Sequence, residues 1–253
     1  MNWHGNSDQL KQDWDRDGYL VLKNFLNQNE TQSVAGNIER YIAEVLPNLG
    51  EGSVYEDKKR PETIKRLSNM DKHDEYFHGL YYDSRFIKLA EKLLEDEVIA
   101  KNMQWFNKNS RDGKETPPHQ DGYYFMLDPN EALTIWLALD HVDEMNGCMR
   151  YVPGAHLRGM RPHRTSEVLG FSKGITDYGN ADYAAERPIT AEPGDIAIHH
   201  CMMVHRADAN NSDKPRSALG LVYFAKRAKS TDTRKSNSQE YIHHRDLEKG
   251  INQ

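Results

Sequence analysis

The sequence predicts a mainly β protein, a two-sheet jelly roll with N-terminal α-helices packed on one sheet. Helical hydrophobic spacing is confined to the first hundred residues, and short apolar segments separated by Gly, Pro, Asn and Asp follow from about residue 98. One of those segments is apolar on both faces. The length of 253 residues suits one domain. We expect a single domain over 1–253, with a helical part at about 1–97, a jelly-roll core at about 98–225 and a charged tail at 226–253.

Two packing helices are predicted in the N-terminal part. Between residues 29 and 46, four apolar residues fall on one helical stripe: Val34, Ile38, Ile42 and Val45. The segment 84–100 repeats the pattern, with Ser84 as the expected N-cap. Its buried side is predicted to carry Phe86, Leu89, Ala90, Leu93 and Leu94.

The predicted strands cover 98–108, 119–127, 132–140, 148–156, 194–200 and 217–224. In the segment "ALTIWLALD", Thr134, Trp136 and Ala138 share one face, and four leucine or isoleucine side chains share the other. Because both faces are poor in charge, this strand should be covered on one side by a second sheet and on the other by the helices. Residues 157–190 have weak periodicity and are predicted to form a long excursion of the kind that serves as a lid or binding loop.

Composition excludes several classes of protein. The formal charge is −6, with 39 acidic and 33 basic residues, and no basic run is interleaved with aromatic residues, so nucleic acid is not an expected partner. No stretch approaches the roughly 18–20 apolar residues that a membrane span needs, and the first residues lack a secretion-signal pattern. Cys148 and Cys201 are expected to be reduced thiols, which favours a cytoplasmic location.

The segment "PPHQD" contains the first candidate metal ligands. Pro117 and Pro118 favour an extended chain, and residues two apart in a strand point to the same side, so His119 and Asp121 can converge. One H-x-D pair is weak evidence, because such pairs are more often polar residues at a strand end. A third ligand is required.

Candidates for that third ligand follow the Pro-Gly-Asp turn. His199 and His200 point in opposite directions on a strand, so at most one of them can face a shared site, and His205 comes after that strand. In the next segment Arg216 shares a face with Ala218, Gly220 and Val222. Small residues beside an inward-facing arginine leave room for a bound anion.

Two histidines and one carboxylate on one face of a metal leave open positions, as in non-haem Fe(II) oxygenases. Arg216 could clamp a dicarboxylate through two hydrogen bonds. Two alternatives stay open: a zinc hydrolase with the same ligands, and a catalytically silent metal- or ligand-binding jelly roll. Arg216 argues against the hydrolase, because a zinc site of this kind needs no clamp for a dicarboxylate.

These residues belong to a wider pattern: "HQD" at 119–121, "NGCMRYVPGAH" at 146–156, "PGD" at 193–195, and then His205, Asn210 and Arg216. In order and spacing, over about residues 60–225, the sequence resembles the phytanoyl-CoA dioxygenase (PhyH) family of Fe(II)- and 2-oxoglutarate-dependent oxygenases. The resemblance implies a double-stranded β-helix, the cupin-like form of the jelly roll. It also implies Fe(II) as cofactor, with 2-oxoglutarate and O2 as co-substrates.

The resemblance assigns roles residue by residue. His119, Asp121 and His205 correspond to the iron ligands, and Arg216 to the partner of the distal carboxylate of 2-oxoglutarate. Four further residues match positions that line the co-substrate pocket or contact its other end: Thr134, Trp136, Gln104 and Lys65. Family relatives that halogenate lack the carboxylate, so Asp121 favours hydroxylation. His200 and His156 are expected to be structural, and His243 and His244 solvated.

For the substrate, we expect a small anionic or zwitterionic metabolite, such as an organophosphonate of the 2-aminoethylphosphonate type. The cations that could hold it are Lys108, Arg111, Arg158, Arg161, His163 and Arg164. Tyr123 is preferred as a substrate contact because strand alternation puts it on the face of the metal ligands, with Tyr124 in the core. The alternative is an acyl-CoA hydroxylase, for which no broad basic surface is evident. The sequence does not indicate the oligomeric state.

Overall fold

The computed structural model describes residues 7–49, 54–55, 64–111, 113–165 and 173–231. The helices are α1 (Ser7–Asp17), α2 (Gln28–Arg40), α3 (Glu75–Tyr81), α4 (Ser84–Leu94), α5 (Gly122–Phe125) and α6 (Asn180–Ala185). The strands are β1 (Tyr19–Leu22), β2 (Val54–Tyr55), β3 (Arg66–Ser68), β4 (Val98–Lys108), β5 (Thr116–His119), β6 (Leu127–Asp128), β7 (Ala132–Ala138), β8 (Met149–Tyr151), β9 (His163–Thr165), β10 (Lys173–Ile175), β11 (Arg187–Ile189), β12 (Ile196–His200), β13 (His205–Ala207), β14 (Arg216–Ala225) and β15 (Lys229–Ser230).

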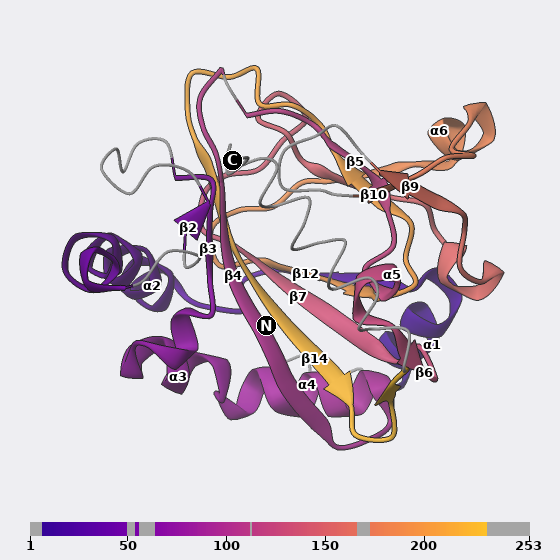
Figure 1. The fold of residues 1–253 in the computed structure, drawn as a ribbon, viewed down its shortest axis with the longest axis horizontal. Coiled ribbons are helices and arrows are strands. Elements are labelled where there is room, and N and C mark those ends of the chain that lie inside the picture. Colours follow the sequence, from indigo (N-terminus) through magenta and orange to yellow (C-terminus); the bar gives the residue numbers. More distant parts are fainter. Residues whose placement is uncertain (1–6, 50–53, 56–63, 112, 166–172, 232–253) are drawn as a thin grey trace, which may run out of the picture.

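Two antiparallel sheets form the jelly roll. The large sheet has the order β1-β12-β7-β14-β4-β3-β2, and the small sheet has the order β11-β8-β13-β5. Figure 1 shows α3 and α4 on one side of the large sheet, with β5 and the β9–β10 hairpin on the other. The predicted fold, a jelly roll with a helical buttress, is confirmed. None of the helices in the described ranges is long and apolar enough to cross a bilayer.

The central strand β7 is buried along its whole length, as the sequence predicts. Leu133, Ile135 and Leu137 pack in a core between the large sheet and the helices. Trp136 and Ala138 pack in a second core between the two sheets. The inward-facing row of the large sheet can therefore contribute polar side chains to a site enclosed by both sheets.

The N-terminal helices follow the sequence pattern with two differences. In α4 the predicted apolar residues are buried, but the N-cap is Asp83, whose side chain accepts a hydrogen bond from the backbone of Arg85. After α2 the chain makes a π-helical turn, Tyr41–Val45. This wider turn brings Tyr41 and Leu46 into the core, while Ile42 and Val45 are only half-buried.

The predicted strand over 119–127 is wrong. Strand β5 ends at His119, and Asp121 is the N-cap of the short helix α5. The chain turns here because the backbone N–H groups of Tyr124 and Phe125 bond to the carbonyl of Asp121. A helical turn has a different side-chain periodicity from a strand, so the alternation argument for Tyr123 and Tyr124 fails.

The excursion at 157–190 contains regular structure: the paired strands β9 and β10, then α6 and β11. Arg161 joins its two halves through ion pairs with Asp177 (2.9 Å) and Asp182 (2.8 Å). In the predicted charged tail, β15 pairs with β6, and His243 and His244 lie outside the described residues.

Tyr81 of α3 joins the helical layer to an irregularity in the large sheet. The pairing of β4 with β14 shifts its register between Val222 and Tyr223. At this shift the Tyr81 hydroxyl accepts hydrogen bonds from the backbone N–H groups of Lys101 (2.8 Å) and Asn102 (2.6 Å). It donates to the carbonyl of Val222 at 2.6 Å. The hydroxyl therefore replaces ladder partners that the bulge removes.

Replacing Tyr81 by Phe keeps the ring but removes these three hydrogen bonds in the interior. We expect the free energy of unfolding to fall by about 2–3 kcal/mol, because buried backbone groups lose their partner. Denaturant titration measures the change. The neighbouring Tyr82 is 52% exposed, and Tyr82→Phe should change stability by no more than about 0.5 kcal/mol. Equal effects of the two variants would contradict the bulge role.

Candidate metal centre

Three side chains that can ligate a metal converge between the sheets. His119 is the last residue of β5 and His205 the first of β13, and the two are direct partners in the ladder of the small sheet. Asp121 follows two residues after His119, at the start of α5. One ligand atom from each of the three lies within 4.8 Å of the others. The turn into α5, rather than an extended strand, brings Asp121 to the histidines.

Backbone carbonyls fix the orientation of both imidazole rings. Nδ1 of His119 lies 2.8 Å from the carbonyl oxygen of Pro117, and Nδ1 of His205 lies 3.0 Å from that of Met203. A carbonyl only accepts, so each Nδ1 carries the proton and each Nε2 keeps its lone pair. The two Nε2 atoms lie 3.6 Å and 3.9 Å from Oδ1 of Asp121. This is the tautomer that metal ligation requires.

Asp121 is oriented by residues of the large sheet. Its Oδ2 accepts a hydrogen bond from Thr134 Oγ1 at 2.9 Å and lies 3.1 Å from Nε2 of His199. Nδ1 of His199 in turn lies 2.9 Å from the hydroxyl of Tyr151. Thr134, predicted to line the co-substrate pocket, therefore contacts a ligand candidate directly.

The electrostatics favour two neutral imidazoles and one carboxylate anion. Burial lowers the pKa of His119, and burial together with the adjacent histidines lowers the pKa of His205 well below its usual value. Burial acts to raise the pKa of Asp121, but the hydrogen bond from His199 and the neighbouring imidazoles hold it well below its usual range. A His2Asp set of this charge suits a divalent first-row metal.

Arg216, the first residue of β14, lies buried on the same inward face of the large sheet. Its Cζ is 5.3 Å from the centre of the Trp136 ring, and its Nη2 donates to the carbonyl of Gly147 at 2.9 Å. Within the described part of the chain, its buried Nε finds no acceptor. Burial lowers the pKa of Arg216 to about 10, with Cys148 and Asp140 opposing, so the guanidinium stays charged at neutral pH. A buried cationic donor without an acceptor fits a bound anion.

The loop before Gly147 holds that carbonyl in place. Asn146 accepts a hydrogen bond from the backbone of Asp143 at 2.9 Å and donates to the carbonyl of His141 at 2.7 Å. Gly147 has a φ of +88°, and a Cβ there would lie 2.6 Å from the carbonyl oxygen of Asp208. Only glycine fits this turn without strain, which explains the "NGC" motif.

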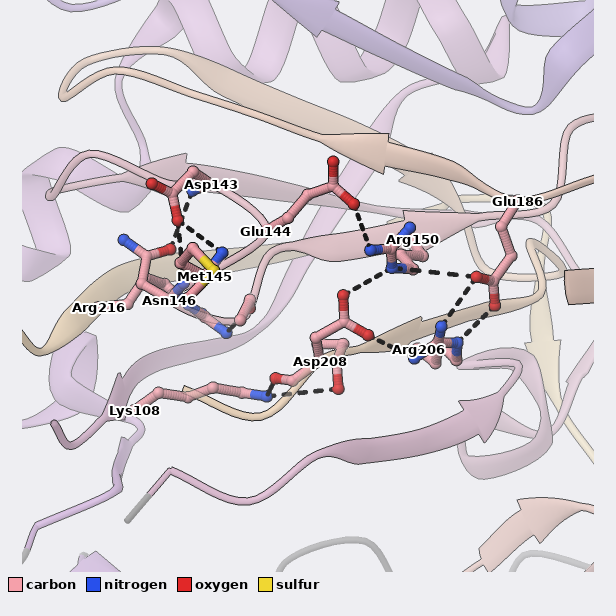
Figure 2. Close-up of polar contacts among 12 residues, drawn as sticks. Lys108, Asp143, Glu144, Met145, Asn146, Arg150, Glu186, Arg206, Asp208 and Arg216 are labelled. Atoms are coloured by element: carbon pink, nitrogen blue, oxygen red, sulfur yellow. Dashed lines mark hydrogen bonds and ion pairs between the residues drawn. The ribbon is translucent and has the colours of Figure 1, made fainter. Parts of the chain in front are cut away.

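Lys108 is the ladder partner of Arg216 in the β4–β14 pair. Its Nζ donates to the backbone carbonyl of Asp208, as Figure 2 shows, and lies 3.4 Å from that of Ala207. Burial, followed by the positive charge of Arg216, lowers the pKa of Lys108 to about 6. The residue predicted as a substrate contact is therefore a half-buried neighbour of Arg216.

An ion-pair network fixes the strand that carries His205. Asp208 accepts hydrogen bonds from Arg150 of β8 and Arg206 of β13, both at 2.6 Å. Arg206 also pairs with Glu186, at the end of the excursion (Figure 2). Strand β13 is thus tied to β8, its neighbour in the sheet, and to the chain entering β11, which lies beyond β8.

The other predicted residues lie around this centre. Gln104 pairs with Gly220, which also pairs with Trp136, so Gln104 is on the same sheet row as Trp136. Lys65 precedes β3, one strand further out, and its carbonyl accepts a hydrogen bond from the backbone of Asn107 at 2.8 Å.

The two tyrosines of α5 are both half-buried and do not follow the predicted alternation. The ring of Tyr124 lies 6.2 Å from that of His119 and is half-buried, so its predicted core position is wrong. The ring of Tyr123 stacks on His163 of β9 at 4.4 Å. Tyr124 is therefore the tyrosine that packs against a metal-ligand candidate.

Two of the predicted substrate cations, Arg111 and Arg161, have partners elsewhere. The charge of Arg161 is compensated within the excursion, and Arg111 pairs with Asp213. Arg158 and Arg164 are exposed. Fewer cations are available to an anionic substrate than the sequence suggests.

His199 and His200 point in opposite directions, as predicted. His200 accepts a hydrogen bond from the backbone of Met202 and contacts the rings of Trp14 and His156, on the side away from the metal ligands. Strand alternation predicted that only one of the pair faces inward. The contacts of His199 with Asp121 and with Tyr151 were not predicted.

Comparison with known proteins is consistent with this site. The model of the family "Phytanoyl-CoA dioxygenase (PhyH)" matches residues 14–218. Peroxisomal phytanoyl-CoA dioxygenase of Bos taurus is 25% identical over 225 residues, which cover 83% of this chain and 66% of the bovine protein. The phytanoyl-CoA dioxygenase domain-containing protein 1 homolog of Caenorhabditis briggsae is 24% identical over 276 residues, covering 90% and 93%. The chain thus spans just under two thirds of the bovine protein's length.

Solved structures share the fold. The epimerase SnoN in complex with Fe3+, alpha ketoglutarate and nogalamycin RO superposes with a TM-score of 0.73 at 24% identity, covering 90% of this chain and 86% of SnoN. EctD from S. alaskensis with 2-oxoglutarate and 5-hydroxyectoine gives 0.70 at 21% identity, covering 86% and 75%. The fold is that of the iron- and 2-oxoglutarate-dependent oxygenases. By the match over residues 14–218, the chain belongs to the phytanoyl-CoA dioxygenase family, whose members are Fe(II)- and 2-oxoglutarate-dependent dioxygenases.

The low pKa of Lys108 predicts a pH-dependent contribution to stability. Between about pH 6 and the ordinary value of 10.5, the unfolded chain holds a proton that the folded chain does not, so this group adds stability as pH rises. Lys108→Met should therefore stabilise the protein most near pH 6, and its advantage should shrink by up to about 1.4 kcal/mol per pH unit toward pH 10. Denaturant titrations at several pH values measure this difference. Lys114→Met, at an exposed position, is the control, and equal pH slopes for the two variants would contradict the lowered pKa of Lys108.

Proposed function

We propose that this protein hydroxylates an aliphatic C–H bond of a small anionic or zwitterionic metabolite, with Fe(II) as cofactor and 2-oxoglutarate and O2 as co-substrates. In this reaction one oxygen atom enters the substrate as a hydroxyl group, and the other enters succinate as 2-oxoglutarate loses CO2. The observation that carries the proposal is the His119–Asp121–His205 cluster together with the buried Arg216, whose Nε has no acceptor in the described part of the chain.

The ligand candidates fit iron. His119 and His205 would each give an unprotonated Nε2, and Asp121 would give a carboxylate oxygen, which leaves open positions as in the non-haem Fe(II) oxygenases. When bound, Fe(II) supplies the oxidative chemistry at a C–H bond. The chain contributes fixed ligands: the two rings are held by the carbonyls of Pro117 and Met203, on strands that are paired with each other.

Arg216 would hold the distal carboxylate of 2-oxoglutarate. Its guanidinium lies beside Trp136, and Thr134, two residues away on the same face of β7, touches Asp121. Same-face positions on a strand are about 7 Å apart, so a five-carbon dicarboxylate fits between the metal ligands and Arg216. The carboxylate would also favour the protonated form of Lys108. Gln104 and Lys65 remain our candidates for contacts at the other end of the co-substrate.

For the substrate, we propose a small acid such as an organophosphonate of the 2-aminoethylphosphonate type. Gln120, between the two ligands His119 and Asp121, bonds to the backbone of Gly159 and Arg161 at 3.0 Å and 2.8 Å. This contact holds the segment with Arg158 next to the metal ligands, and Arg158 is exposed there. Tyr124 is our candidate for an aromatic contact with the substrate. The ring of Tyr123 lies 5.9 Å from that of Tyr124 and stacks on His163.

The same segment supports the alternative substrate. Leu157 is 71% exposed and Met160 is 40% exposed, and apolar side chains beside the site favour a substrate with an acyl chain, as in an acyl-CoA hydroxylase. Succinate release in the presence of small phosphonates, carboxylates or acyl-CoA esters decides between the two. Faster release with acyl-CoA alone would replace the small acid.

Arg216→Ala tests the co-substrate clamp. We expect anaerobic titration of the wild-type protein with Fe(II) and 2-oxoglutarate to produce the visible charge-transfer band of the chelate. The variant should need about 10- to 100-fold more 2-oxoglutarate, since a charge-assisted pair contributes about 1.5–3 kcal/mol. The exposed Arg164→Ala is the matched control. An unchanged requirement in Arg216→Ala would remove the clamp assignment, and no band with tight zinc binding would favour a hydrolase.

Asp121→Ala tests the metal ligand. Loss of the anionic ligand should weaken Fe(II) binding by at least about 100-fold and abolish 2-oxoglutarate turnover, because two neutral histidines remain. Equilibrium dialysis of Fe(II) and succinate assays measure both effects, with His200→Gln as a control that faces away from the site. Full activity of Asp121→Ala would transfer the ligand role to another residue, with His199 the first candidate.

A further inference from the structure

The two oxygens of Asp121 have different surroundings. Oδ2 accepts a hydrogen bond from Thr134 at 2.9 Å and lies 3.1 Å from Nε2 of His199. Oδ1 lies 3.6 Å and 3.9 Å from the Nε2 atoms of His119 and His205, which both keep their lone pairs. One oxygen therefore faces the other ligand candidates, while the large sheet holds the second.

The direction of these hydrogen bonds follows from the groups involved. A carboxylate only accepts, so Nε2 of His199 carries a hydrogen, and in the neutral ring Nδ1 is then the acceptor. The Tyr151 hydroxyl, 2.9 Å away, donates to that Nδ1. It also lies 3.7 Å from Sδ of Met149, a much weaker acceptor. Tyr151 thereby fixes the tautomer in which His199 donates to Asp121.

All three supporting residues stand on paired strands and are buried. Tyr151 of β8 is the ladder partner of His205, and His199 of β12 is the partner of Thr134. Their exposed fractions are 0% for Tyr151, 2% for His199 and 7% for Thr134. If Asp121 turned to offer both oxygens to a metal, two interior donors would lose their acceptor. The surrounding sheets resist that rotation.

We propose that His199, oriented by Tyr151, acts with Thr134 to restrict Asp121 to a single metal bond. This inference rests on the proposed function, in which His119, Asp121 and His205 are the ligands. Two imidazole nitrogens and one carboxylate oxygen leave three of six positions for other ligands, whereas a chelating carboxylate leaves two. A 2-oxo acid takes two positions, so the positioning residues preserve the third.

Counting the waters on a bound Mn(II) ion tests this directly. Electron paramagnetic resonance of the Mn(II)-loaded protein in water enriched with oxygen-17 reports the number of coordinated waters through line broadening. We expect three waters in the wild-type protein and two in the His199→Phe/Thr134→Val double variant, because Oδ2 is then free to bind. The single variant His199→Gln retains an N–H donor of similar reach, so it should show three waters, as the wild-type protein does. His200→Gln, which faces away, should also show three.

A second measurement separates positioning from general damage. In His199→Phe we expect the kcat for 2-oxoglutarate turnover to fall by about 10- to 100-fold, the range typical of lost outer contacts to a metal ligand. The KM for 2-oxoglutarate should change little, because both positions for a chelating 2-oxo acid remain. His199→Gln should regain most of the kcat. Parallel loss of kcat and affinity in both variants would indicate structural damage and overturn the proposal.

The outcomes separate a failure of the positioning role from a failure of the proposed function. Three waters in the double variant, with Mn(II) bound, would refute the positioning role and leave the ligand assignment intact. If the double variant does not fold, the single variants His199→Phe and Tyr151→Phe carry the test, and an unchanged water count together with an unchanged kcat in both refutes it. A wild-type protein that binds neither Mn(II) nor Fe(II) overturns the proposed function itself.

Discussion

The pairing of β5 with β13 is the interaction on which the site depends. It places His119 directly opposite His205, so two imidazoles from distant parts of the chain meet across one ladder position. The bulge in this ladder lies between His205 and Ala207, just beyond that position. The ion pairs from Asp208 to Arg150 and Arg206 hold β13 in this place. The other elements of the fold then bring Asp121 and Arg216 toward the two histidines.

Much of the fold is predictable because burial leaves a periodic signal. Strand β7 is apolar on both faces, and the structure buries both. The metal-ligand candidates were predictable as well, since His119, Asp121 and His205 come together as the resemblance implies, although their ligand role remains a prediction. The route was partly wrong: Asp121 reaches the histidines through a helical turn, and nothing in "HQDGYYF" distinguishes that turn from a strand.

Contacts between distant segments were not predictable. Which of His199 and His200 faces inward depends on the register of β12 against β7, and that register could not be predicted from the sequence. The partners of Arg161 lie beyond a hairpin, so its charge looked available for a substrate when carboxylates already neutralise it. Likewise, the low pKa of Lys108 arises from its burial beside Arg216, which only the pairing of β4 with β14 creates.

Among the described residues Nε of Arg216 has no acceptor, and this has a consequence for the choice between 2-oxo acids. A site that buries a charged donor rejects a molecule lacking the matching acceptor more strongly than it rejects one with merely poorer packing. Pyruvate and other 2-oxo acids without a second carboxylate would leave Nε of Arg216 desolvated and without a hydrogen-bond acceptor. Discrimination among 2-oxo acids would then come from a penalty on the wrong molecule as much as from attraction for the right one.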